Sequence, residues 1–129
     1  MSVRGVRGAT TVARNDRAVI LAATRELLDL LVRLNGIAGE DVASVWFTLT
    51  ADLDAEFPAV AARDLGWTEV PLMCGREVPV PGALEGCIRV LIDWNTERAQ
   101  GEVRHAFLHG ARALRPSWAI DLPGDPPRP

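Results

Sequence analysis

Two arginines lie in segments whose other residues predict β-strands. Arg7 stands within RGVRGATTV and, because side chains alternate along an extended chain, shares a face with mostly small residues: Val3, Gly5, Ala9 and Thr11. Arg89 stands within CIRVLIDW, the most apolar strand-like segment of the chain, on the same face as Cys87 and Leu91. Both side chains therefore place a permanent positive charge on a sheet face that otherwise has little polarity.

A guanidinium in such a strand needs a negative partner, because an uncompensated buried charge is severely unfavourable. The ordinary solution for a lone strand arginine is an ion pair, here with Glu77, Asp93 or another acid. Two arginines that enter sheet faces from different strands favour a second interpretation, a convergent anion site. Since guanidinium forks match carboxylate oxygens two at a time, the ligand expected for Arg7 and Arg89 is a small carboxylate.

Three further charged residues are candidates for the same site. Arg63, on a predicted short helix, and Arg115, just before a proline, either add positive charge at the rim or are solvated surface residues. Glu77, in a loop between predicted strands, is either solvated or the one acceptor in a site made of donors.

Other acid–base and metal chemistry has little support in the sequence. The two histidines, His105 and His109, are four residues apart on a predicted strand, which fits neither a helical zinc pair nor a catalytic triad, so they are interpreted as ordinary residues and no metal is expected. The chain contains no lysine, which excludes Schiff-base chemistry. Cys74 and Cys87 have no close metal spacing and make no disulfide framework.

Composition predicts one folded domain. The chain has 129 residues, of which 48% are hydrophobic and 24% charged, as in ordinary globular proteins. A net charge of −3 provides no basic field, so nucleic acid is not an expected partner. The sequence shows neither a signal region nor an apolar run of membrane-spanning length, so a cytoplasmic protein without membrane contact is expected.

Hydrophobic periodicity predicts a mixed α/β (α+β) domain with a single sheet. Strands are expected at 2–13, 42–50, 67–75, 87–95 and 104–114, with a long helix within 15–36 and a short helix within 57–66. Pro71 indicates that the third strand lies at an edge or carries a bulge. Both helices are expected to cover one face of the sheet, which leaves the other face in need of a partner.

The domain is expected to span residues 1–115. From Pro116 to Pro129 the chain is proline-rich, and a mobile C-terminal tail is predicted.

Six blocks in this order resemble the monofunctional chorismate mutases of the trimeric pseudo-α/β-barrel type: RGVRGATTV, FPAVAARDLGW, VPLMCGREVPVPGAL, CIRVLIDWNT, VRHAFL and ALRP. The resemblance runs collinearly from about residue 2 to residue 118. It implies a homotrimer whose neighbouring subunits cover the open face of the sheet, with active sites between subunits. It also implies the Claisen rearrangement of chorismate to prephenate, on the way to phenylalanine and tyrosine, with no cofactor and no covalent intermediate.

The resemblance also implies roles for individual residues. Arg89 donates to the departing ether oxygen, Arg7 grips the substrate carboxylates, and Glu77 accepts from the ring hydroxyl. The remaining substrate-binding residues are Met73 and Cys74, the latter beside the ring, together with Phe107 and, from the neighbouring subunit, Phe57, Arg63, Leu114 and Arg115.

Two positions depart from the family pattern. Phe107 stands where the family usually has a tyrosine, and Val60 where a relative can have lysine. Each change removes a polar contact near the substrate carboxylates, so a raised Michaelis constant is expected more than lost turnover. Two other functions stay open: an imine or enamine deaminase of a similar trimeric barrel, and a non-catalytic sensor of a carboxylate metabolite.

Overall fold

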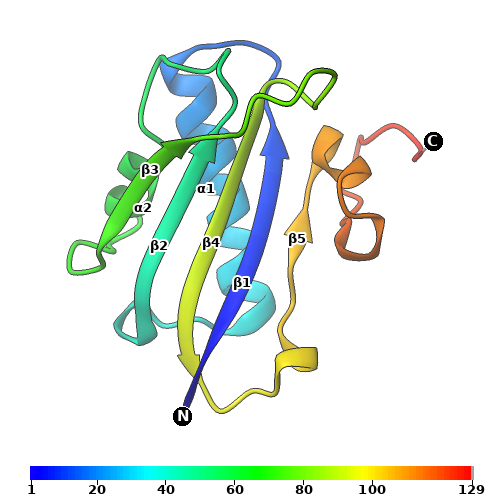
Figure 1. Cartoon of the computed structure of the whole chain (residues 1–129). Helices are drawn as coiled ribbons and strands as arrows, with labels where there is room; N and C mark the ends of the chain where they lie inside the picture. Colours follow the sequence, from blue (N-terminus) through cyan, green and yellow to red (C-terminus); the bar gives the residue numbers. More distant parts are fainter. Residues whose placement is uncertain (129) are drawn as a thin grey trace.

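A computed structural model describes residues 1–128 as one five-stranded sheet with helices on one face (Figure 1). The strands and α-helices, in chain order, are β1 (Ser2–Thr11), α1 (Arg17–Asn35), β2 (Val42–Leu49), α2 (Ala59–Asp64), β3 (Leu72–Arg76), β4 (Cys87–Thr96) and β5 (Ala106–Phe107). Short 3₁₀ helices are η1 (Gly39–Asp41), η2 (Gln100–Glu102), η3 (His109–Ala113) and η4 (Pro116–Trp118). The expected α+β domain with a single sheet is confirmed.

The sheet has the order β3-β2-β4-β1-β5. β4 pairs antiparallel with β1 and β2, whereas β3 is parallel to β2 and β5 is parallel to β1. β3 is an edge strand, as Pro71 indicated. The strand predicted for 67–75 is wrong at its start, because β3 begins only at Leu72, after the proline.

α1 begins and ends where its sequence provides caps. The side chain of Asp16 accepts a hydrogen bond from the backbone N–H of Val19, and Gly36 adopts the left-handed conformation (φ 73°) that closes the last turn. Leu27, Leu28 and Leu31 lie on the face that packs against the sheet and are fully or almost fully buried. The long helix predicted within 15–36 is thus confirmed.

Glycine in β1 allows α1 to approach the sheet closely. A Cβ atom on Gly8 would lie 2.8 Å from Leu31 Cδ1, closer than real Cβ contacts, and 3.0 Å from Val90 Cγ1, a tight contact. The helix side chains therefore occupy the space that a side chain at this position would take.

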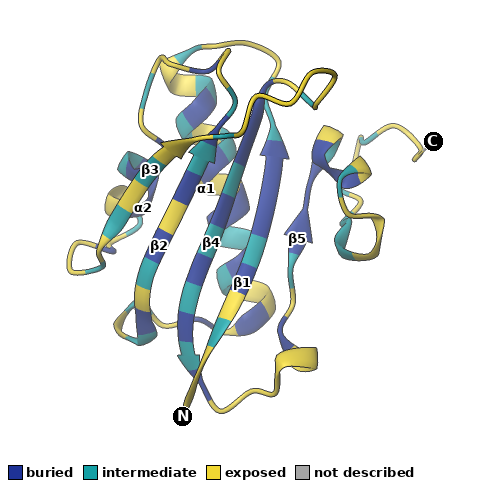
Figure 2. Ribbon diagram, in the orientation of Figure 1, coloured by how far each residue is buried: buried dark blue, intermediate teal, exposed yellow. Residues whose placement is uncertain are grey.

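Both α-helices cover the same face of the sheet, and the opposite face is left open (Figures 1 and 2). On the open face several large apolar side chains are exposed, among them Trp46 on β2 (47%) and Met73 on β3 (55%). The expectation of one covered and one open face is confirmed. Within residues 1–128 no helix, α1 included, combines the length and the apolar character that a membrane crossing requires.

The strand predicted for 104–114 is wrong over most of its length. Only Ala106 and Phe107 pair with β1, after which the chain turns into η3 at His109, whose φ is 51°. Other hydrogen bonds replace strand pairing in this segment: Gly110 N donates to Thr11 Oγ1 on the distant strand β1, and Ala111 N donates to Leu108 O within the turn. His105 and His109 therefore do not share a strand.

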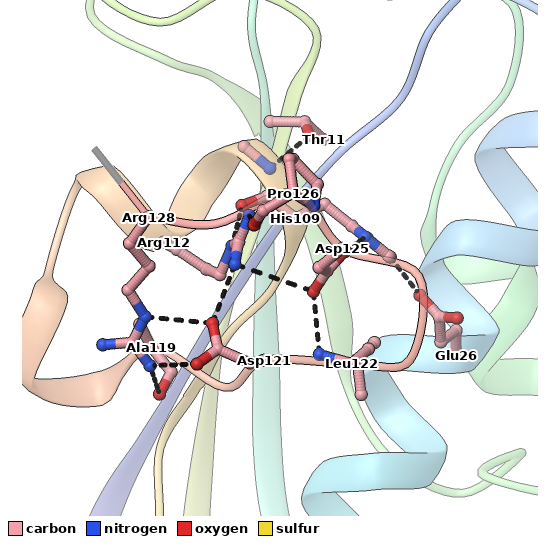
Figure 3. Close-up of polar contacts among 11 residues, drawn as sticks. Thr11, Glu26, His109, Arg112, Ala119, Asp121, Leu122, Asp125, Pro126 and Arg128 are labelled. Carbon is pink, nitrogen blue, oxygen red and sulfur yellow. Dashed lines mark hydrogen bonds and ion pairs between the residues drawn. The ribbon is translucent and has the colours of Figure 1, made fainter.

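A set of polar side chains, here called the C-terminal clamp (His109, Arg112, Asp121 and Asp125), fastens the end of the chain to the domain (Figure 3). The guanidinium of Arg112, whose side chain is only 8% exposed, donates to His109 O (2.8 Å), Asp121 Oδ1 (2.7 Å) and Pro126 O (3.0 Å). Mobility of the tail stays a prediction, and any such motion would have to break these contacts.

Candidate functional site

Strand register aligns two rows of side chains on the open face of the sheet. Cross-strand partners lie on the same face of a sheet, so the pairing defines each row. One row contains Arg7, Leu91, Trp46 and Met73. The next row contains Phe107, Ala9, Arg89, Thr48 and Gly75. Arg7 and Arg89 therefore enter one face from neighbouring strands, as the convergent anion site inferred from the sequence requires.

Glu77 lies beside Arg89, directly after β3. Its Oε2 is 3.4 Å from Arg89 Nε and also accepts a hydrogen bond from the hydroxyl of Thr48. The ion pair expected for a strand arginine is thus present. Glu77 and Arg89 attract each other as opposite charges but form no hydrogen bond through Nε. Arg89 Nε is buried and has no hydrogen-bond partner within residues 1–128.

An unpaired buried donor matters because leaving it unsatisfied costs about 1–3 kcal/mol, and more for a charged group. The side chain of Arg89 is 28% exposed, so the rest of its guanidinium can still reach a ligand. The strand and its neighbours hold this donor in place before any acceptor arrives. Such an arrangement suits binding of an anionic or developing negative oxygen.

The surroundings of Arg7 are strongly positive. Partial burial lowers the pKa of Arg7, and the charges of Arg89 and Arg115 lower it further, while Glu77 acts in the opposite direction. Three guanidinium groups thus act on a region with one carboxylate. An anion placed there would relieve the repulsion among the arginines, which supports the inferred anion site.

A cavity of about 270 Å³ lies over this part of the sheet, lined by Arg7, Trp46, Thr48, Glu77, Arg89, Val90 and Leu91. A larger hollow of about 700 Å³ lies under the loop that follows β3, and Glu77 and Arg89 line it too. Glu77 and Arg89 therefore line both cavities, the one over the strands and the one under the loop.

Phe107 and Arg115 complete the β5 side of the cluster. The ring of Phe107 is almost fully buried, and Arg7 Cζ lies 5.6 Å from its centroid. Leu114 packs on the small apolar group of Ala9, Phe107 and Ala111. Arg115 was expected to come from a neighbouring subunit; within one chain its charge also acts on Arg7.

The remaining expected substrate contacts lie elsewhere on the chain. Phe57 and Cys74 line a separate hollow of about 390 Å³, and Arg63 lies on α2 with its charge acting on Cys74. Cys74 pairs with the buried Phe47, on the helix-covered face, where burial raises the pKa of its thiol. Within one chain, then, Cys74 is not beside Arg89.

Met73 shares the open face with Arg7, but two strands separate them. At the usual strand spacing the two backbones are about 14 Å apart. The single chain therefore brings together Arg7, Glu77, Arg89, Phe107 and Arg115 as one group, and it keeps Phe57, Arg63, Met73 and Cys74 apart from that group.

Three residues of the site were missed in the sequence. Thr48 was predicted only as part of a strand, because its position beside Glu77 depends on the register of β2 against β3. Trp118 and His105 stack on each other, with ring centroids 3.9 Å apart, and Arg115 Cζ lies 3.7 Å over the ring of Trp118. No local pattern connects residues 105, 115 and 118, because a turn of the chain brings them together. No group of three or more His, Cys, Asp or Glu in the described part of the chain is arranged to hold a metal ion.

Comparison with known proteins gives a consistent result. Residues 3–118 match the family model described as chorismate mutase type I. The chain is 52% identical over 115 residues to chorismate mutase AroH of Thermus thermophilus, covering 88% of this chain and 94% of that protein. It is 41% identical over 121 residues to chorismate mutase AroH of Bacillus subtilis, covering 93% and 95%.

A solved structure of chorismate mutase from Clostridium thermocellum has the same fold. It superposes with a TM-score of 0.84 at 47% sequence identity, and the match covers 85% of this chain and 98% of that one. With the family model spanning nearly the whole domain and relatives of this identity, the chain belongs to the chorismate mutase type I family.

Proposed function

We propose that this protein is a chorismate mutase that isomerises chorismate to prephenate, a step in phenylalanine and tyrosine biosynthesis. Family membership supports the activity, and the observation that carries the mechanism is the Arg89 guanidinium. Its Nε is buried beside Glu77 without a hydrogen-bond partner in residues 1–128, while the rest of the group is accessible in the cavity that Arg7 also lines. The reaction is an intramolecular Claisen rearrangement: the ether C–O bond breaks as a C–C bond forms within the same molecule. Atoms balance without a second substrate, and the proposed mechanism uses no cofactor, metal or covalent intermediate.

Electrostatic stabilisation is the main contribution assigned to the protein. As the ether bond breaks, negative charge grows on the enolpyruvyl oxygen, and Arg89 is assigned to donate to that oxygen. A donor positioned before the reaction needs no reorganisation when the charge develops. Arg7, supported by Arg115, is assigned to the substrate carboxylates, which also holds the flexible molecule in its folded, reactive conformer.

Glu77 is assigned to the ring side of the substrate. Its Oε2 already faces Arg89 and the hydroxyl of Thr48, which orients the carboxylate without using all of its acceptor positions. It can accept a hydrogen bond from the ring hydroxyl and face the ring as it becomes electron-poor. The two partners, Arg89 and Glu77, then bracket the breaking bond with opposite charges.

We further propose a homotrimer in which two chains build each site. Phe57 is 64% exposed and Met73 is 55% exposed, and neither reaches the arginine group within its own chain. A second copy packed on the open face would cover the exposed Trp46 and Met73. It could also bring its own Phe57, Arg63 and Cys74 to the arginines of the first. The assembly is assigned to the cytoplasm, where a small carboxylate substrate would be met.

A single experiment tests activity and assembly together. Chorismate is mixed with the purified protein, its absorbance is followed, prephenate is identified as the product, and the native mass is measured in the same buffer. Catalysed conversion by a species with the mass of three chains is expected. Absence of conversion would refute the proposed activity: ammonia release from an imine substrate would then favour the deaminase, and melting stabilised by chorismate without turnover would favour a sensor.

A further inference from the structure

Trp118 lies at the centre of a stack that joins the C-terminal segment to the arginine group. Arg115 Cζ lies 3.7 Å from the ring centroid of Trp118, and His105 stacks against Trp118 with centroids 3.9 Å apart at 35°. The ring of Phe107 is 5.9 Å away at 57°. Trp118 therefore has a cation on it and the aromatic residues of the β5 region beside it.

We propose that Trp118 is a positioning residue: its indole ring fixes the guanidinium of Arg115 at the carboxylate end of the site, so that Trp118 sets substrate affinity without touching substrate. This inference rests on the proposed function, because it assigns Arg115 to the substrate carboxylates.

The backbone around Trp118 holds the ring in place. Trp118 N donates to Arg115 O (2.9 Å), which closes the η4 turn started by Pro116. Directly afterwards Ala119 forms a bridge with Phe107, and Ile120 N donates to Phe107 O (3.0 Å). The indole is thus attached to β5, the strand next to the one that carries Arg7.

His105 connects the stack to Arg7 itself. Its Nδ1 accepts a hydrogen bond from the backbone N–H of Arg7 (2.9 Å), which requires this nitrogen to be unprotonated. Burial lowers the pKa of His105, and the nearby charges of Arg7 and Arg115 lower it further. A neutral imidazole can stack on Trp118 without repelling the guanidinium on the same indole.

The C-terminal clamp supports the arrangement from the other side. The Arg112 guanidinium is bonded to Asp121 and to Pro126 O, on the far side of Trp118 along the chain (Figure 3). Residues 115–120 are therefore held at both ends. In contrast, the Arg115 side chain is exposed and makes no ion pair within residues 1–128. Its guanidinium lies instead on the indole ring of Trp118.

Ordering Arg115 before substrate binds removes an entropy cost from binding. A free arginine loses its rotamer freedom when it grips a carboxylate, whereas an arginine stacked on indole has already lost part of it. The stack exists both before and during the reaction, so its loss should weaken ground-state and transition-state binding alike. This pattern raises KM and leaves kcat nearly unchanged.

The test is a double-mutant cycle on steady-state kinetics with chorismate. Trp118→Leu should raise KM about fivefold with kcat within about twofold, and Trp118→Phe should restore most of the affinity because a ring face remains. In an Arg115→Ala background, Trp118→Leu should change KM by less than about twofold. Ser117→Ala, in the same turn, is the matched control and should behave as wild type.

Two kinetic outcomes would overturn the proposal: an unchanged KM in Trp118→Leu, or an equal rise of KM when Arg115 is already absent. A second measurement does not depend on turnover. NMR should show the Nε–H proton of Arg115 shifted upfield by the indole ring current, and the shift should disappear in Trp118→Leu. An inactive wild-type protein would refute the proposed function, and the NMR signal would still decide whether Trp118 orders Arg115.

Discussion

Replacing Arg89 by lysine separates the charge of this side chain from the geometry of its donors. Arg89→Lys keeps a positive charge near Glu77 and keeps a long side chain on β4. It removes Nε, the buried donor with no hydrogen-bond partner in the described chain, together with the planar fork. A point charge on a flexible stem cannot reproduce that fork.

The magnitude follows from the role of a preorganised donor. Removing one donor to a developing oxyanion costs about 3–4 kcal/mol, or a few hundredfold in kcat at about 1.36 kcal/mol per tenfold. Because lysine retains the charge, the expected loss lies at the lower end, about a hundredfold. The loss should fall on kcat, since the interaction strengthens only as the ether bond breaks.

Steady-state rates from chorismate absorbance give kcat and KM for each variant. Arg25→Lys is the matched control, because Arg25 also pairs with an acid, Asp29, at 3.1 Å, but on the outer surface of α1. The control should retain wild-type constants. A kcat for Arg89→Lys within about tenfold of wild type would refute the reasoning, and so would a loss that appears only in KM.

Three further variants test Glu77, Phe107 and His109. Glu77→Gln keeps an acceptor for Thr48 but removes the charge that faces Arg89, so kcat should fall about tenfold or more in the chorismate assay. Phe107→Tyr adds a hydroxyl near Arg7 at the carboxylate end, and steady-state kinetics should show KM lowered about tenfold with little change in kcat. Burial disfavours the charged form of His109, but its bonds to Glu26 and Asp125 prevail and raise the pKa. The His109 contribution to stability is therefore present below the unfolded pKa of about 6.5 and is lost as pH rises through the folded pKa. In urea unfolding, the loss of unfolding free energy in His109→Gln relative to wild type should be largest at about pH 6 and smaller at about pH 9.

Each variant is compared with the wild-type protein in the same buffer and at the same pH. His105 has a lowered pKa and contributes the opposite pH trend, so only the difference between wild type and His109→Gln isolates His109. A deficit that grows with pH would contradict the ion-pair explanation. For Phe107→Tyr, an unchanged KM would show that the hydroxyl does not reach the carboxylate end. For Glu77→Gln, unchanged kcat would remove Glu77 from the reaction.

The sequence alone determined most of the fold because its signals are local. The apolar periodicity that predicts a long helix lies wholly within residues 15–36, and the structure has α1 there. Alternation within β1 and within β4 predicted which neighbours share a face with Arg7 and with Arg89, whereas the observed register puts the two arginines on one face of the sheet. The order of six sequence blocks identified the family, which the comparisons confirmed.

Tertiary structure decided what depends on contacts between distant residues. Register made Thr48 a partner of Glu77 and put Cys74 on the covered face, and neither position follows from a strand pattern, because a slip of one residue reverses every side chain. The segment after Phe107 was predicted as strand, yet bonds to Thr11 and Asp125 made it a 3₁₀ helix and a clamp. Trp118 reached Arg115 only because the chain turns at Pro116. Local preferences are properties of a few residues, whereas these contacts depend on the free energy of the whole folded chain.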